Sequence, residues 1–320
     1  MIDRARIQQN LNNCLTQTDI PSLGPVKHGK VRDVYERGNE LILIATDRQS
    51  AFDRILAAIP FKGQVLNQVS QFWFENTRHI IRNHAVRYPD PNVIIAKKCT
   101  VFPVEFVVRG YLTGVTGTSV WTAYQKGSRE FCGNLLPDGM RKNQPFATPI
   151  ITPSTKSDEH DENVTPAQII ERALMSKEDW YYTSQKALEL FAHGQKVARE
   201  HGMILVDTKY EMGKDADGNI LLIDEVHTPD SSRYWIAESF QQRIAEGKEP
   251  ENIDKEFLRL WFKDHCDPYN DKELPKAPDE LVVELSARYI QLYEAITGQQ
   301  FEYPDGSNIQ ERIQKNITKV

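Results

Sequence analysis

The first hundred residues carry short hydrophobic runs that indicate β-strands. Runs at 31–36 and 40–46 are separated by a polar, glycine-containing turn at 37–39, a combination that predicts a β-hairpin. Two further apolar runs, at 92–96 and 102–108, are typical of buried strands. This part of the chain is therefore expected to be rich in β-structure.

Helical periodicity appears at three places. Apolar residues recur at helical spacing over 65–82, and a longer helix is predicted over 177–201, where Gly202 ends it. The clearest helical pattern is at 279–297, with Gly298 as its C-cap. Residues 236–320 as a whole are expected to be mostly helical.

The middle of the chain changes character. Residues 110–119 are rich in glycine and threonine, and Thr118 or Ser119 is a suitable N-cap for a helix through Gln125. Residues 135–163 are polar and contain prolines, with little periodicity. A stretch that long without regular structure is expected to be functional or disordered.

The predicted elements follow a clear order along the chain: strands come first, a mixed segment follows, and helices come last. This order predicts an α+β protein in two lobes. We expect a β-rich N-terminal lobe at 1–110 and a central α+β lobe at 111–235. A helical region at 236–320 is expected to pack on the central lobe.

Composition and charge exclude several classes. The 39 Lys and Arg against 45 Asp and Glu give a net charge of −6, which argues against a nucleic-acid or membrane-surface binder. No apolar run approaches the roughly 20 residues that span a bilayer, and the first residues lack the apolar core of a signal peptide. The four cysteines contain no CxxC pair. A cytoplasmic protein fits these features best.

Residues 24–31 nearly match a Walker A loop, but Val31 stands where the magnesium-binding hydroxyl would be, and a strand follows instead of a helix. A glycine-bearing loop that leads into a hairpin is how kinase-like folds cover nucleotide phosphates, here with Gly29, Lys30 and Arg32. An ordinary turn with solvated cations is the alternative.

Strands at 203–211 and 220–226 flank Asp217-Gly218. A two-residue turn there pairs residues whose numbers sum to 435, which sets Glu211 opposite Asp224. Two facing carboxylates are unfavourable unless a cation lies between them, and Mg²⁺ takes one or two carboxylates plus phosphates. Asp207, Lys209 and Glu211 share one strand face. A solvated outer face is the alternative.

Two further sets of charged and polar residues suit the binding of small ligands. Arg109 at a strand end, the hydroxyl-rich helix start at Ser119 and Arg233 together suit an anion. Lys156 and Asp161 lie close together in the polar loop and suit a small polar ligand. A surface salt bridge and a solvated charged loop are the corresponding alternatives.

In order along the chain, these segments resemble the SAICAR synthetase family of purine biosynthesis. The matching stretches cover about two thirds of the chain and include GKVRDVYE at 29–36, LILIATDRQSAFD at 41–53, residues 103–119, KSDEHDEN at 156–163, DTKYEMG at 207–213 and IDEVHTPDSSRYW at 223–235. The resemblance implies a fold related to the ATP-grasp and kinase folds. It also implies an ATP- and Mg²⁺-dependent ligase that joins the carboxylate of 4-carboxy-5-aminoimidazole ribotide to the amine of L-aspartate through an acyl phosphate.

The resemblance also assigns roles to residues. The nucleotide-binding positions are Gly29, Lys30, Arg32 and, through the backbone of the adenine-facing linker, Glu105. The metal-associated acids are Glu211 and Asp224, with Lys209 between the metal and the phosphates. The ribotide-binding positions are Arg109, Ser119, Lys156, Asp161 and Arg233. Asp207 is expected to position the aspartate amine or take its proton.

Two other functions compete with the ligase. A kinase-type phosphotransferase would carry HRD-like and DFG motifs, and the sequence has neither. A catalytically silent nucleotide-binding regulator is expected to lack one of the paired acids or the loop lysine, and all of these are present. The stretch at 131–163 and the C-terminal region are longer than in compact bacterial members of the family, which leaves a monomer and a homo-oligomer both open.

Overall fold

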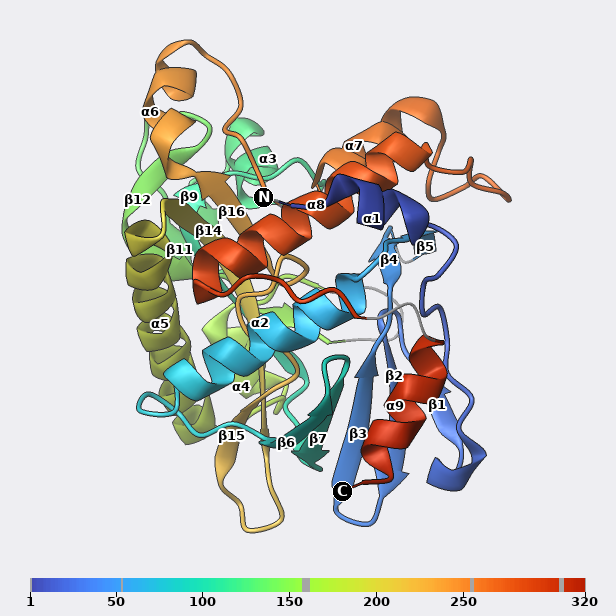
Figure 1. Ribbon diagram of the computed structural model, residues 1–320. Coiled ribbons are helices and arrows are strands. Elements are labelled where there is room, and N and C mark those ends of the chain that lie inside the picture. The colour runs from blue at the N-terminus through green and yellow to red at the C-terminus, as the bar shows by residue number, and fades with distance from the viewer. Residues whose placement is uncertain (1, 53, 157–161, 254–255, 305–307, 320) are drawn as a thin grey trace.

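Two large antiparallel sheets, two short two-stranded sheets and the surrounding helices make up the described part of the protein (Figure 1). The computed structural model describes residues 2–52, 54–156, 162–253, 256–304 and 308–319. This mixture of antiparallel sheets and helices is the expected α+β class.

The first sheet has the strand order β1-β2-β3-β7-β6. Its strands are β1 (Val26–His28), β2 (Arg32–Arg37), β3 (Glu40–Ala45), β6 (Ala85–Asp90) and β7 (Val93–Lys97). The predicted hairpin is confirmed, because β2 and β3 pair from Arg32↔Ala45 to Arg37↔Glu40. The C-terminal helix α9 (Ile309–Ile317) packs Ile313 and Ile317 against this sheet. A separate ribbon pairs β4 (Arg48–Ala51) with β5 (Arg54–Ala58).

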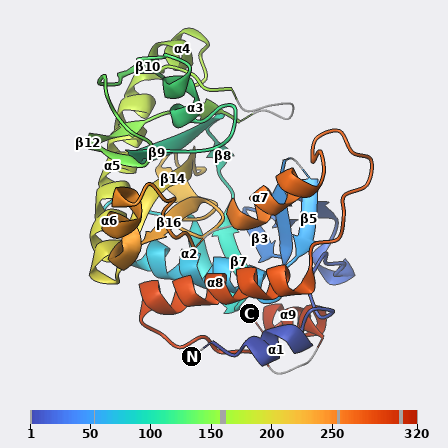
Figure 2. The ribbon, with the colours of Figure 1, turned by 90° about the horizontal axis from the view of Figure 1, so that it is seen from above.

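The second sheet has the order β12-β9-β14-β15. Off this path, β13 pairs with β9, and both β8 and β16 pair with β14. The long strands are β9 (Val104–Leu112), β12 (Gln144–Ile151) and β14 (Met203–Lys214), and the shorter ones are β8 (Thr100–Val101), β13 (Ser154–Thr155), β15 (Ile220–Ile223) and β16 (Ser232–Ile236). Helix α5 (Lys177–Glu200) runs along one face of this sheet (Figure 2). The opposite face carries the predicted site residues of β9 and β14.

Helices α2 (Lys62–Asn76) and α8 (Asp279–Thr297) pack beside each other, and α1 (Arg4–Gln9) lies against α8 (Figure 2). Trp73, Phe106, Tyr210 and Tyr289 belong to one continuous buried core that joins these helices to the second sheet. The remaining elements are η1 (Pro21–Leu23), α3 (Val120–Gln125), β10 (Glu130–Phe131), β11 (Asn134–Leu135), α4 (Pro166–Glu171), α6 (Ala237–Ala245) and α7 (Glu256–His265).

The helix ends follow their capping chemistry. Ser119 caps α3, and the Thr165 side chain forms a capping box at the start of α4. Helix α8 ends at Gly298, whose φ of 69° is accessible to glycine at little cost. Of the helices described, none is long and apolar enough to cross a membrane.

Three expectations were wrong in detail. The predicted helix at 65–82 is α2, which begins at Lys62 and ends at Asn76. The stretch at 135–163 contains strand β12, which its two prolines and exposed edge position hid from the pattern. The hairpin near Gly218 pairs Glu211 with Ile223, so the register differs by one residue from the prediction. A five-residue loop replaces the two-residue turn, because Asp215 accepts hydrogen bonds from the backbone of Asp217 and Asn219.

Candidate active site

Arg109, Asp207 and Arg233 form one row across three strands of the second sheet. Asp207 on β14 pairs with Arg109 on β9 on one side and with Arg233 on β16 on the other. Both arginines donate to the same carboxylate oxygen, Asp207 Oδ2, at 3.3 and 3.2 Å. Burial lowers the pKa of Arg109, and the neighbouring Asp207 carboxylate opposes that shift. The row therefore presents two guanidinium groups held in place by one carboxylate.

A cavity of about 310 Å³ opens beside this row. Arg109, Ser119 and Arg233 all line it, as the sequence predicts for an anion site. Ser119 reaches it because it is the N-cap of α3. Arg259 on α7 also lines this cavity and an adjoining smaller one that includes Asp207. Its Nε is buried and has no hydrogen-bond partner among the residues described.

Lys209 lies two positions along β14 and bridges two carboxylates. Its Nζ donates to Glu105 Oε1 at 2.7 Å and to Glu211 Oε1 at 3.1 Å. Lys156 donates to the other oxygen of Glu211. Burial alone would lower the pKa of Lys209, but the carboxylates of Glu211, Glu105 and Asp224 outweigh burial and raise the pKa above its usual value. The ammonium group therefore stays charged. The Glu105 side chain thus contacts Lys209 inside the site, whereas the family resemblance implies that Glu105 meets the adenine through its backbone.

Arg32 connects the first sheet to the two acids that follow β15. Its guanidinium donates to Asp224 Oδ1 at 2.5 Å and to Glu225 Oε2 at 2.6 Å. Burial raises the pKa of Asp224, but Arg32, Lys209 and Lys156 outweigh it and hold that pKa below its usual value. Burial raises the pKa of Glu225, despite the same arginine. The Asp224 carboxylate is therefore the more readily ionised of the two.

The donor set around Glu211 and Asp224 fits a hard divalent cation. Glu211 is opposite Ile223 and not Asp224, yet both carboxylates interact electrostatically with Lys209 and Lys156. Within the described ranges no group of three or more His, Cys, Asp or Glu side chains forms a metal cage. Mg²⁺ needs only one or two carboxylates when phosphates and water complete its shell, so two acids suffice.

The predicted phosphate loop is a tight turn between β1 and β2. The Gly29 N–H donates to the Arg32 carbonyl at 2.7 Å. Arg48, which sequence reasoning missed, donates to the carbonyls of Gly29 and Lys30 at 2.8 and 3.2 Å and to Asp33 at 2.9 Å. Lys30 itself is exposed at the tip of this turn.

Interactions of Arg32 with Asp224, and of Asp224 with the Lys209 cluster, connect predicted residues of the two sheets. The same region also contains residues that were not predicted. Asp161 lies outside the described residues. The missed residues include Glu225, Arg259 and His84, which is buried within electrostatic reach of Arg32 and Glu211. Glu225 stands directly beside Asp224 in the sequence, so its charge and position were a usable signal. Arg259 and His84 come from segments without any distinguishing pattern.

Comparison with known proteins shows the family of this chain. The sequence pattern of the SAICAR synthetase family matches residues 25–276. A phosphoribosylaminoimidazole-succinocarboxamide synthase of Legionella pneumophila (strain Paris) is 60% identical over 307 residues, which are 96% of this chain and 98% of that protein. A chloroplastic enzyme of the same name from Arabidopsis thaliana is 56% identical over 319 residues, covering 98% of this chain and 78% of that protein.

Among solved structures, the SAICAR synthase of Saccharomyces cerevisiae in complex with SAICAR superposes with a TM-score of 0.78 at 34% identity. The match covers 90% of this chain and all of the yeast chain.

Proposed function

The chain belongs to the SAICAR synthetase family and is an ATP-dependent ligase that condenses 4-carboxy-5-aminoimidazole ribotide with L-aspartate to SAICAR, ADP and phosphate; from that premise we propose how its residues divide the reaction. One observation carries the proposal. A single face of β14 sets the arginine pair around Asp207 next to the lysine–carboxylate cluster around Lys209.

The arginine-lined cavity holds the ribotide in this proposal. Arg109, Arg233 and Ser119 bind its anionic groups, because guanidinium groups and a helix N-cap both favour phosphate and carboxylate oxygens. Lys156 and Asp161 contact the imidazole ring. Asp207, held between the two arginines, positions the aspartate amine or takes its proton.

The nucleotide occupies the side of the site that the first sheet covers. Gly29, Lys30 and Arg32 contact its phosphates, and the 103–105 segment contacts its base. Glu211 and Asp224 hold Mg²⁺, which when bound neutralises phosphate charge. Lys209 adds a fixed positive charge between these acids and the ribotide, where negative charge grows during phosphoryl transfer.

The chemistry needs alignment more than a protein nucleophile. A carboxylate is a poor electrophile because oxide would have to leave. Attack of a ribotide carboxylate oxygen on the γ-phosphorus of ATP releases ADP and gives an acyl phosphate. The aspartate amine then attacks the acyl carbon, and inorganic phosphate leaves with the bridging oxygen. Two substrates held on one rigid sheet face supply the alignment.

Transfer of ¹⁸O tests this route. The ribotide is labelled with ¹⁸O in its carboxylate and converted with ATP, Mg²⁺ and L-aspartate, and the released phosphate is analysed by mass spectrometry. The route requires one carboxylate oxygen in each phosphate. Phosphate that carries no ¹⁸O would contradict it.

The proposal also includes the division of the chain into lobes, its cellular compartment and its partners. We place the nucleotide-covering lobe at 1–110, the catalytic lobe at 111–235 and the helical region at 236–320. All four cysteines are unpaired, as expected of a protein in a reducing compartment such as the cytoplasm. The partners are the three small-molecule substrates, and both a monomer and a homo-oligomer are compatible with the site.

A further inference from the structure

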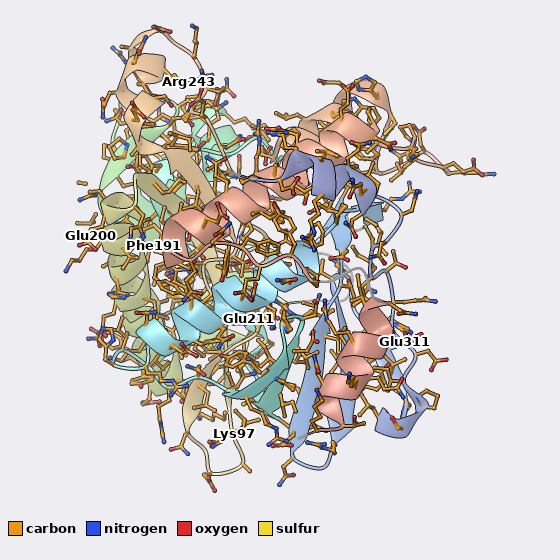
Figure 3. All side chains as sticks on the ribbon, in the orientation of Figure 1. Lys97, Phe191, Glu200, Glu211, Arg243 and Glu311 are labelled. Atoms are coloured by element: carbon orange, nitrogen blue, oxygen red, sulfur yellow. The ribbon has the colours of Figure 1, made fainter. Side chains whose placement is uncertain are left out.

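A cavity of about 720 Å³ lies at the edge of the second sheet that faces away from the first sheet. Its lining includes residues of β12, of the C-terminal end of α5 and of α6. Figure 1 shows where these elements lie. Figure 3 labels Glu200 on α5 and Arg243 on α6, the two helices at this edge. Glu311, on α9, is labelled on the opposite side of the molecule. None of the residues assigned to the ligase reaction lines this cavity. Its volume is within the range of small-molecule sites.

An aromatic cluster contributes to the wall between this cavity and the ribotide site. The ring of Tyr111 packs edge-on against Trp235 with centroids 5.0 Å apart, and Trp235 stacks on Phe240 at 5.3 Å. Tyr111 and Phe240 line the cavity, whereas Arg109, two residues before Tyr111 on β9, lines the ribotide site. The two cavities have no lining residue in common, although strand β9 contributes to both.

The lining combines an apolar floor with cations and amides. Met203, Leu205, Phe240 and Ile244 supply the apolar surface, and Gln195 and Gln241 supply amide groups. Arg141 and Arg199 also line the cavity, and neither guanidinium has a side-chain hydrogen bond or ion pair with any residue the structure describes. The third cation, Lys142, is neutralised by Glu249 at 2.6 Å.

We propose that this cavity is a second ligand site and that it binds a nucleoside monophosphate. The base packs on Phe240 and Tyr111, since aromatic side chains favour stacked or edge-on ring contacts. The glutamine amides donate to or accept from the edge of the base. The phosphate binds Arg141 and Arg199, because a guanidinium pairs with phosphate through two parallel hydrogen bonds.

Equilibrium dialysis with radiolabelled AMP tests the proposal. Saturating Mg²⁺–ADP and SAICAR are included so that the catalytic site is occupied. Wild-type protein is compared with the double variant Arg141→Ala/Arg199→Ala and with Lys196→Ala, which removes an exposed cation of α5 outside the cavity. Unlabelled adenosine, which has no phosphate, serves as a competitor.

The expected result is one retained AMP per chain in wild type and in Lys196→Ala. The double variant should bind AMP at least tenfold more weakly while it keeps the wild-type turnover. Adenosine should compete at least tenfold less well than unlabelled AMP. Equal AMP affinity in wild type and double variant, or no AMP retained beside the catalytic-site ligands, would overturn the proposal. The comparison between variants does not depend on turnover, so its failure is distinct from a failure of the ligase assignment.

Discussion

Lys62 and Asp230 form a buried ion pair between two distant parts of the chain. The Lys62 Nζ donates to Asp230 Oδ2 at 2.7 Å, and both side chains are almost completely inaccessible to solvent. The Tyr289 hydroxyl donates to the other oxygen of the same carboxylate at 2.6 Å. Asp230 thus links α2, the segment that precedes β16, and α8. This contact fixes the segment that carries Arg233.

Replacement of Lys62 by Met should destabilise the fold strongly. The substitution keeps much of the side-chain volume but leaves the Asp230 carboxylate buried without its ammonium partner, which costs about 3–5 kcal/mol in comparable cases. Urea unfolding followed by fluorescence measures this free energy. Lys126→Met, at an exposed position, is the matched control. A loss below about 1 kcal/mol would contradict the importance of this pair.

Asp224→Asn should abolish turnover and weaken the binding of Mg²⁺–ATP. The amide cannot supply the negative charge that Arg32, Lys209 and Lys156 stabilise on the native carboxylate. Initial rates and nucleotide titrations with and without Mg²⁺ measure both effects. Asp217→Asn removes an acid at the exposed tip of the same hairpin and should leave both unchanged. Near-normal activity of Asp224→Asn would rule out this residue as a metal ligand.

Arg233→Ala should weaken ribotide binding by about 1.5–3 kcal/mol, which is the range for a lost hydrogen bond to a charged group. That corresponds to roughly a 10- to 150-fold rise in the ribotide Kd. Direct titration of the ribotide measures it, and the Kd for ATP should change much less. Arg37→Ala, at an exposed position in the first sheet, is the control. An unchanged ribotide Kd would remove Arg233 from the pocket.

His84 should make the protein sensitive to mild acid. Burial and then Arg32 lower its pKa from 6.5 to about 3, although Glu211 opposes the shift. The folded protein therefore keeps His84 neutral, whereas the unfolded chain takes up a proton as the pH falls below about 6.5. This contribution to stability is complete above that pH and decreases as the pH falls toward the folded pKa.

The variant His84→Gln separates this effect from other acid-sensitive groups. Between pH 7 and pH 5, the linkage relation gives a loss of about 2 kcal/mol from this histidine alone. The free energy of unfolding of His84→Gln should therefore fall by about 2 kcal/mol less than that of wild type over the same interval. Urea titrations at the two pH values measure it. Equal decreases in both proteins would show that His84 is not the titrating group.

Local patterns predicted the parts of the fold that local chemistry decides. The β2–β3 turn, the Ser119 cap and the Gly298 cap depend on neighbouring residues alone, and each is found where expected. The register after β14 was wrong because it depends on the Asp215 side chain, which rearranges the turn. Strand β12 was missed because its partner, β9, and not its own sequence, makes it a strand.

The residues of the candidate site also fall into two groups: those that motifs predicted and those that only the tertiary structure reveals. Arg109 and Arg233 were predicted together as part of an anion site, and Asp207 was predicted in a different group; the strand pairing brings all three into one row. Arg259 was not predicted, because an arginine on an amphipathic helix carries no signal until α7 is seen beside the cavity. The same holds for Arg48, whose role depends on carbonyl groups of a distant turn.

The central claim, that this chain is an aspartate-dependent ligase, is tested most directly by ADP release. ADP is measured with Mg²⁺–ATP and 4-carboxy-5-aminoimidazole ribotide, in the presence and absence of L-aspartate, and SAICAR is quantified in parallel. Sustained release that requires both co-substrates and equals the SAICAR formed is the predicted result. No ADP under any combination would contradict the ligase and favour a catalytically silent nucleotide-binding protein.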